Sequence, residues 1–302
     1  GGSMANRPAQ AARDSVLVTL SPVVFVLLWS TGFIGARYAM PHAEPMTFLT
    51  LRFVLGAALL AAFTAATGGT FRMSARDIGH LAVAGVLMQA IYLGGVFAAI
   101  ALGLEAGTSA LIVGVQPVLT AALAGPLLGE RVRPLQWLGL ALGLAGVTMV
   151  VGEKLGAGLG TPLAVALNVL SLLGIAVGTI YQKRFCQDLP MRAGIVVQFV
   201  AAAVACGAMA LIFETGEIRW TGELVFALLW LTLVLSLGAV SLLYVLIRRG
   251  AASNVASLFF LVPPSTATIA WILFGERMPP LALAGMGVTV AGVLLVTFSR
   301  RA

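Results

Sequence analysis

The second half of this 302-residue chain repeats the first half at a constant offset of 146 residues. The tripeptide Gly-Glu-Arg at 129–131 returns at 275–277, and Pro117 falls on Pro263. Both halves must therefore adopt the same fold, and any structural interpretation of one half has to hold for the other. Further matched pairs are Gly32 with Gly178, Phe53 with Phe199, and Gly139 with Gly285.

The composition places this repeated unit in a lipid bilayer. Hydrophobic residues make up 60% of the chain and charged residues 10%, with a mean hydropathy of +1.04, whereas a soluble domain carries about 25% charged residues. A helix that crosses a bilayer needs about 20 mostly apolar residues. Ten segments meet this requirement: 16–36, 46–67, 78–103, 107–128, 134–152, 161–182, 192–213, 223–247, 251–274 and 279–299.

The placement of arginine and lysine tests this count of ten. If successive connections alternate between the two sides, 13 Lys and Arg residues lie on the side of the termini and 4 on the other side. Cytoplasmic connections are enriched in these residues, so both termini should be cytoplasmic. The isoelectric point of about 10.2 then reflects membrane topology, and we expect no nucleic-acid partner.

The odd number of spans in each half sets the relation between the halves. Residues 16–152 form one five-span repeat and 161–299 the other, so the second repeat enters the bilayer from the opposite side. Inverted repeats of this kind are typical of secondary transporters, because two such copies can exchange which side is open. We interpret residues 1–15 as a cloning scar, Gly1-Gly2-Ser3, and a cytoplasmic tail, and the apolar run from Val16 as a retained first helix rather than a signal peptide.

Several motifs resemble the EamA repeat of the drug/metabolite transporter superfamily. They are Leu28–Gly35, Gln116–Val118, Leu127–Arg131, Gln136–Gly139 and Gly146–Val147, with second copies at Val262–Pro263, Gly275–Arg277, Pro280, Gly285 and Gly292–Val293. Within the ten-helix branch the chain is most similar to the YddG-type exporters of aromatic amino acids. The resemblance implies helices around a central cavity and export of amino acids, related metabolites or cationic drugs across a bacterial inner membrane.

Polar side chains inside the spans are the candidates for binding a solute, because they are costly in hydrocarbon and usually face the bundle interior. Gln89 and Tyr92 are three residues apart and share one face of their helix. The alternative for each residue is a structural hydrogen bond to a neighbouring helix. The candidate substrate-binding residues are Trp29, Arg52, Gln89, Tyr92, Gln116, Asn168, Ser241 and Tyr244, with Ser236 nearer the middle of its span.

Arg52 is the only charged residue well inside a predicted span. One hypothesis is that Arg52 pairs with a substrate carboxylate. The other is that it caps helix carbonyls or snorkels toward Glu44 or Glu105. Its counterpart in the second half is Gln198, so the repeat itself does not require the charge.

Pro117 and Pro263 occupy equivalent positions in the fourth and ninth spans. Proline removes a backbone donor and breaks the regular hydrogen bonding of the preceding turn. Discontinuous helices at matching positions of two repeats mark the binding site in many transporters. We therefore predict a hinge or cavity role for both prolines, against the alternative of a static kink.

The remaining classes of membrane protein fit the chain poorly. An intramembrane enzyme needs a paired nucleophile and base or a set of metal ligands at membrane depth, and a channel needs charged rings, and neither pattern occurs. A receptor or structural membrane protein is disfavoured by the inverted repeat and by connections too short for an extramembrane domain. We expect no cofactor and no metal. No Asp or Glu lies at mid-membrane depth, which favours an uncoupled carrier of neutral amino acids over a proton-coupled exporter of a different metabolite or drug. We expect the protein to be a monomer.

Overall fold

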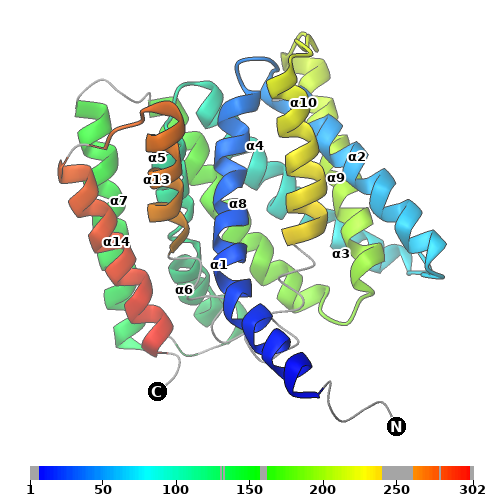
Figure 1. Ribbon diagram of the computed structural model, residues 1–302, viewed down its shortest axis with the longest axis horizontal. Coiled ribbons are helices and arrows are strands. Elements are labelled where there is room, and N and C mark those ends of the chain that lie inside the picture. The colour runs from blue at the N-terminus through cyan, green and yellow to red at the C-terminus, as the bar shows by residue number, and fades with distance from the viewer. Residues whose placement is uncertain are drawn as a thin grey trace.

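The computed structural model describes residues 7–129, 131, 133–156, 162–239, 261–278 and 280–299. These residues form a bundle of helices joined by short connections (Figure 1). The β contact among them is an isolated antiparallel bridge between Ala43 and Ile218. The predicted all-α class is therefore confirmed for the described part of the chain.

Each of the ten predicted spans contains helical residues within the described ranges, and several spans are divided into shorter helices. The helices are α1 (Arg7–Ala39), α2 (Pro45–Ala66), α3 (Ala75–Gly85), η1 (Val86–Ile91), α4 (Tyr92–Ala101), α5 (Ala106–Val113), α6 (Gln116–Leu128), α7 (Pro134–Gly156), α8 (Pro162–Phe185), α9 (Met191–Phe213), α10 (Gly222–Leu229), η2 (Trp230–Ala239), α13 (Val262–Phe274) and α14 (Pro280–Ser299). The two η segments are π-helical.

Five described helical stretches are long and apolar enough to cross a membrane, and a sixth qualifies if a bent pair counts as one span. The bent pair, Ala106–Thr120 and Ala122–Leu128, changes direction by 41°. Pro126 lies inside its second part, where a proline disrupts the helical hydrogen bonds of the preceding turn. The protein is thus embedded in a membrane. The five straight stretches are Pro45–Ala66, Ala75–Ala101, Pro162–Phe185, Met191–Phe213 and Gly222–Ala239.

The repeated Gly-Glu-Arg motif contains the residue that ends a helix in each half. Gly129 ends α6 with a φ of 70°, and Gly275 ends α13 with a φ of 67°. This left-handed conformation is strained for residues with a Cβ and is the usual way in which a helix terminates at glycine. The glycine of the motif is therefore explained by backbone geometry alone.

Helices α7 and α14 bring the backbones of the two halves into close contact, and glycine makes this contact possible. A Cβ atom on Gly292 would lie 2.5 Å from the carbonyl oxygen of Gly139, and one on Gly146 would overlap the carbonyl oxygen of Gly285. The two contacts are equivalent in the repeat, because Gly139 corresponds to Gly285 and Gly146 corresponds to Gly292. They also show that α7 and α14 run antiparallel, since the earlier residue of α7 meets the later residue of α14.

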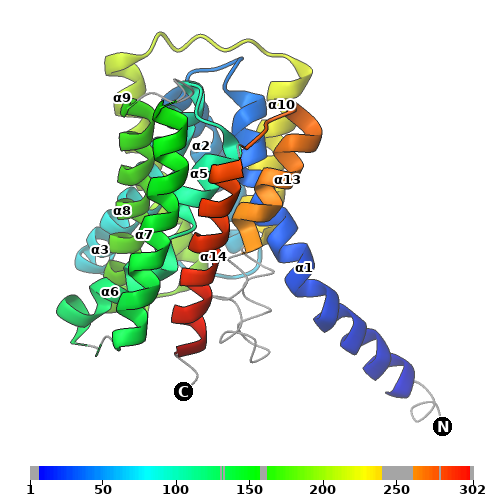
Figure 2. The ribbon, with the colours of Figure 1, turned by 90° about the vertical axis from the view of Figure 1, so that its left-hand side faces the viewer.

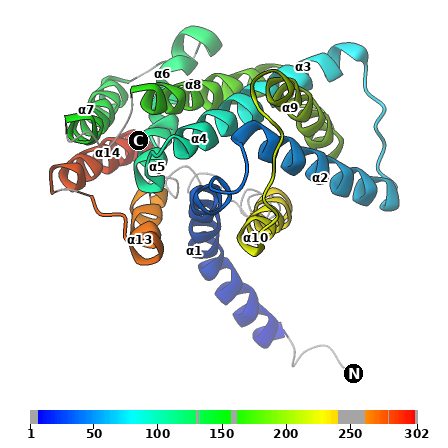
Figure 3. The same ribbon diagram turned by 90° about the horizontal axis from the view of Figure 1, so that it is seen from above.

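Helices α2 and α9 pair in the same antiparallel way at the opposite edge of the bundle, as seen from above in Figure 3. Phe53 and Phe199 are counterparts in the repeat, and their rings stack with centroids 6.0 Å apart. Gly56 packs against the ring of Phe199, and Gly207 packs against Thr50. Equivalent helices thus pack on one another at both edges.

A set of polar contacts, the loop clamp, closes one end of the bundle. It joins residues 40–47, which form the α1–α2 connection and the first turn of α2, to residues 214–221, the α9–α10 connection. The Glu214 carboxylate accepts hydrogen bonds from the N–H groups of Met46 at 2.9 Å and Thr47 at 2.8 Å. The Arg219 N–H donates to the carbonyl of His42 at 2.8 Å, and Glu44 accepts from Thr215. The start of α1 and the end of α14 both lie at the other end (Figures 1 and 2).

An ion pair beside the loop clamp links α1 to the connection after α13. The Arg37 guanidinium lies 3.2 Å from the Glu276 carboxylate, which also accepts the N–H of Ala106 at 3.4 Å. Burial raises the pKa of the Glu276 carboxyl above its usual value, and the charge of Arg37 and the hydrogen bond from Ala106 oppose this shift. The glutamate of the second Gly-Glu-Arg motif thus holds three helices together.

Candidate functional site

A cavity of about 160 Å³ lies between helices from both halves of the chain. Helices α1, α2 and α4 and segment η1 come from the first half, and α8, α9 and η2 from the second half. The lining is mainly apolar, as is usual for small-molecule sites. The lining residues are Trp29, Gly32, Phe33, Arg52, Met88, Gln89, Tyr92, Leu93, Val96, Phe97, Ile175, Phe199, Leu235 and Ser236.

Both π-helical segments border this cavity at equivalent positions of the repeat. Met88 and Gln89 belong to η1, and Leu235 and Ser236 belong to η2. Gln89 and Leu235 are counterparts 146 residues apart, yet both line the same space. The cavity therefore lies where the two halves meet. π-Helical turns are rare and occur frequently at functional sites.

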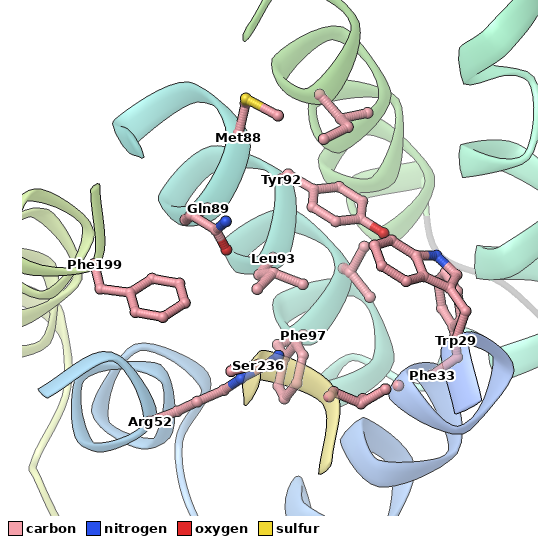
Figure 4. A pocket seen from close by; sticks show the side chains of 14 residues that line it. Trp29, Phe33, Arg52, Met88, Gln89, Tyr92, Leu93, Phe97, Phe199 and Ser236 are labelled. Atoms are coloured by element: carbon pink, nitrogen blue, oxygen red, sulfur yellow. The ribbon is translucent and has the colours of Figure 1, made fainter. Parts of the chain in front are cut away.

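Arg52 reaches from α2 into the cavity (Figure 4). Its residue surface is 8% exposed, and its Nε is buried without a hydrogen-bond partner among the described residues. Among the described residues, ion pairs join Arg37 to Glu276 and His42 to Glu223. Arg52 therefore forms no ion pair with Glu44 or Glu105. The guanidinium is thus a buried cation without a bound counter-ion.

Two other predicted polar residues and a set of aromatic rings line the same cavity as the guanidinium. Gln89 and Tyr92 line the cavity together with Arg52, and Tyr92 extends toward Trp29 in Figure 4. The remaining rings of the wall are Phe33, Phe97 and Phe199. Phe97 is fixed by stacking on Phe48, with ring centroids 5.7 Å apart. Four of the candidate substrate-binding residues, Trp29, Arg52, Gln89 and Tyr92, therefore line the cavity, and so does Ser236, which the sequence analysis also named.

Asn168 lies outside the cavity, in a hydrogen-bonded pair between α8 and α5. Its side chain is fully buried, and its Oδ1 accepts a hydrogen bond from the Ser109 hydroxyl at 2.6 Å. Its Nδ2 donates to the Ser109 carbonyl at 3.3 Å. In this arrangement the amide joins two helices and is not among the groups that face the cavity.

Gln116 also does not line the cavity. Its Nε2 donates to the Thr120 hydroxyl at 3.0 Å, one turn further along α6. The remaining two predicted binding residues, Ser241 and Tyr244, lie outside the described residues.

Pro117 and Pro263 stand in the first turn of α6 and of α13. A proline there forfeits no hydrogen bond, because the first N–H groups of a helix have no partner within it. The span is nevertheless interrupted before Pro117, since α5 ends at Val113 and α6 begins at Gln116. Gly114 lies in this gap, where a Cβ would approach Pro263 Cγ to 2.8 Å. The interruption of one half therefore packs against the proline of the other.

Most of the apolar lining was not predicted from the sequence. Leu93, Val96 and Phe97 continue the face that carries Gln89 and Tyr92, so helical spacing could have found them. Ile175 could have been found as the counterpart of Trp29. Phe199 and Leu235 carry no signal that separates them from the many other apolar residues. Among the described residues no group of three or more His, Cys, Asp or Glu side chains could hold a metal ion.

Comparison with known families places this architecture. The model of the EamA-like transporter family matches residues 15–152 and again residues 162–298. The chain belongs to the EamA-like transporter family. Both matches together cover nearly the whole sequence, so each half is an EamA unit. The chain is accordingly a member of a transporter family, in agreement with its apolar helices and the cavity between them.

Relatives of this EamA-like protein are similar over almost their whole length. The uncharacterized inner membrane transporter YedA of Escherichia coli (strain K12) is 27% identical over 289 residues, which cover 94% of this chain and 92% of YedA. A probable terminal-alkyne amino-acid exporter of Streptantibioticus cattleyicolor is 29% identical over 301 residues, which cover 92% of this chain and 94% of the exporter. A crystal structure with 20% sequence identity aligns with a TM-score of 0.67 over 94% of this chain and 97% of its own, and shares the fold.

Proposed function

We propose that this EamA-like protein exports neutral amino acids with apolar or aromatic side chains across a bacterial inner membrane. The observation that carries the proposal is the cavity between the two halves, in which Arg52, Gln89 and Tyr92 stand among aromatic rings. The polar groups can bind the carboxylate and amino group of an amino acid. The rings can enclose its side chain.

The size of the cavity supports a solute with one small apolar group. At about 160 Å³ it is close to the engineered cavity of about 150 Å³ that holds one benzene molecule. Nucleotide sugars and phosphorylated sugars are larger, and their phosphates call for several buried cations. Arg52 is the one Lys or Arg residue that lines the cavity within the described part of the chain.

The proposed mechanism is alternating access by ten spans in two inverted five-span halves. The reciprocal glycine contacts of α7 with α14 support this arrangement, as does the stacking of Phe53 on Phe199. The charge distribution supports cytoplasmic termini, which would make the loop clamp the periplasmic end. Pro117 and Pro263 would act as hinges where the interrupted span of the first half packs against the start of α13. The protein would work as a monomer and without ion coupling, since no described Asp or Glu lines the cavity.

Similarity to other exporters supports the choice of cargo. The relative from Streptantibioticus cattleyicolor is named as a probable exporter of an amino acid. The resemblance of the sequence to YddG-type exporters favours aromatic amino acids in particular. Both agree with a cavity walled by Trp29, Phe97 and Phe199.

Counterflow in proteoliposomes tests the proposal. Labelled phenylalanine, methionine and threonine are added outside vesicles loaded with the same unlabelled amino acid, with and without an imposed pH gradient. We expect uptake of phenylalanine and methionine in both conditions, since an uncoupled carrier needs no gradient. Uptake that requires the gradient would overturn the uncoupled mechanism, and uptake of none of the three would overturn amino acids as cargo.

Two variants make the test specific for the cavity. Trp29→Ala removes an aromatic side chain from the cavity wall and should reduce phenylalanine counterflow more than methionine counterflow. Leu211→Ala changes a residue of α9 that is 89% exposed, and it should leave both rates unchanged. Equal behaviour of the two variants would contradict the assignment of the site.

A further inference from the structure

Among the described residues, the charge in the cavity lining is positive and has no negative counterpart. Arg52 supplies a permanent positive charge, because a guanidinium stays protonated in proteins. None of the described acidic residues is among the lining residues. The chain has eleven acidic residues in total, and the undescribed segment 240–260 contains none of them. Glu130 and the side chain of Asp14 are the acidic groups outside the described part of the chain.

From this imbalance we infer that the cavity selects its solute by the carboxylate and does not require an amino group. The preferred ligand class is monocarboxylates with one small apolar or aromatic group, and organic cations are disfavoured. The inference rests on the proposed function and narrows its substrate class. It separates carboxylate recognition from amino-acid recognition, which a zwitterionic ligand alone cannot do.

The state of Arg52 supplies the attraction for an anion. Its Nε has no hydrogen-bond partner among the described residues, and its residue surface is 8% exposed, so the charge is poorly solvated. A buried charge without a counter-ion is unfavourable. A carboxylate in the cavity can accept two parallel hydrogen bonds from a guanidinium, which is the strongest pairing available to either group. Binding a carboxylate would therefore offset the desolvation penalty of the buried guanidinium.

The same cavity offers an ammonium group only weak partners. The described oxygen acceptors in the lining side chains are those of Gln89, Tyr92 and Ser236, and none of them carries a charge. The rings of Trp29 and Phe97 can add cation–π attraction, which is modest and is opposed by the repulsion from Arg52. An ammonium therefore contributes little to binding when a carboxylate is present and cannot replace it when the carboxylate is absent.

Three ligands of almost the same shape test this inference. Phenylalanine is the zwitterion, 3-phenylpropionate lacks its amino group, and phenethylamine lacks its carboxylate. Binding to the purified full-length protein in detergent is measured by thermal stabilisation and by competition with labelled phenylalanine. We expect 3-phenylpropionate to bind at least as tightly as phenylalanine, and phenethylamine roughly 10–100-fold more weakly, the range for losing a hydrogen-bonded charge.

A variant at position 52 tests whether the Arg52 guanidinium causes the preference for a carboxylate. Arg52→Gln introduces the residue that the second half carries at the equivalent position, Gln198, so the helix pairing tolerates it. This variant should bind 3-phenylpropionate roughly 10–100-fold more weakly while its affinity for phenethylamine does not fall. Arg52→Lys keeps the charge and should retain part of the preference, and Leu211→Ala should keep all of it.

The outcomes separate this inference from the proposed function. If phenylalanine is transported but phenethylamine binds as tightly as 3-phenylpropionate, the carboxylate rule is wrong and amino-acid export stands. The comparison of the three ligands on the unchanged protein decides this point even if a variant fails to fold. If phenylalanine shows no counterflow and none of the three ligands stabilises the protein, the proposed function itself is wrong.

Discussion

Arg52 and Gln198 occupy equivalent positions of the two halves but have different surroundings. Arg52 lines the central cavity and has no described partner for its Nε. Gln198 donates its Nε2 to Gln182 at 3.2 Å, in a separate pocket of about 240 Å³ between α8 and α9. The helical framework thus repeats, whereas the polar groups that it presents do not.

The same difference holds for the rest of the cavity. Trp29, Gln89 and Tyr92 line it from the first half, and their counterparts at 175, 235 and 238 are isoleucine, leucine and glycine. The second half therefore contributes mainly an apolar wall, with Ser236 as its polar side chain among the described lining residues. Among the described residues, the polar groups of the cavity are thus concentrated in the first half, and the second half contributes mainly apolar surface.

The largest expected effect tests the repeated framework at the α7–α14 contact. Gly146→Ala and Gly292→Ala each place a Cβ against a backbone carbonyl of the other helix, and each should destabilise the protein by about 3 kcal/mol. Gly152→Ala is the control in α7, because a Cβ there meets no atom within 4 Å. The control should be neutral or slightly stabilising, since alanine favours helices. Melting temperatures in detergent measure all three, and unequal losses for the two equivalent glycines would contradict their equivalence.

The second prediction tests whether positions 52 and 198 are functionally different. Arg52→Gln should reduce phenylalanine counterflow roughly 10–100-fold through loss of a charged hydrogen bond. Adding Gln198→Arg should not restore it, because position 198 faces the pocket that contains Gln182 rather than the central cavity. Recovery of transport in the double variant would mean that the two sites are interchangeable.

The third prediction separates structural from binding amides. Asn168→Ala leaves the buried Ser109 hydroxyl without its acceptor and should cost about 1–2 kcal/mol of stability, with the KM for phenylalanine unchanged. Gln89→Ala should do the reverse, raising KM several-fold with a smaller loss of stability, because its amide faces the cavity. Counterflow kinetics and melting temperatures distinguish the two variants. A raised KM for Asn168→Ala would show that this residue contacts solute.

The smallest expected effect concerns the pH dependence at Glu276. Burial raises its pKa in the folded protein, so the folded chain still holds a proton at pH values where the unfolded chain has released it. Stability must then fall as the pH rises from the unfolded to the folded pKa of this carboxyl. Glu276→Gln removes that dependence, so the melting temperature of the variant relative to the unchanged protein should rise through mildly acidic pH and then level off. A difference that is constant with pH would contradict the raised pKa.

Hydropathy and the 146-residue offset predicted where the helices lie, because bilayer thickness and repeat symmetry act on whole segments. The subdivision of the spans was not predictable. The π-helical segments η1 and η2 have ordinary apolar sequences, and their geometry depends on packing between helices. Pro117 did mark an interrupted span, since proline acts on the local backbone.

The rule that polar residues in a span face the interior was correct for Arg52 and Gln89 but could not decide their use. Asn168 and Gln116 obey the same rule, yet each has a polar partner, Ser109 in one case and Thr120 in the other. Whether a buried amide faces a cavity or a neighbouring side chain depends on the rotation of two helices against each other. A single sequence does not contain that information.

The two π segments, η1 and η2, could allow the helices beside the cavity to change register. A π turn holds one residue more than an α-helical turn. Passing that residue one position along the span turns the side chain in between by about 100°, the angle between successive residues of an α-helix. Hydrogen exchange at residues 86–91 and 230–239, with and without ligand, would detect such a shift. Gln89 and Ser236 can then turn relative to the cavity while the flanking helices α4 and α10 keep their packing.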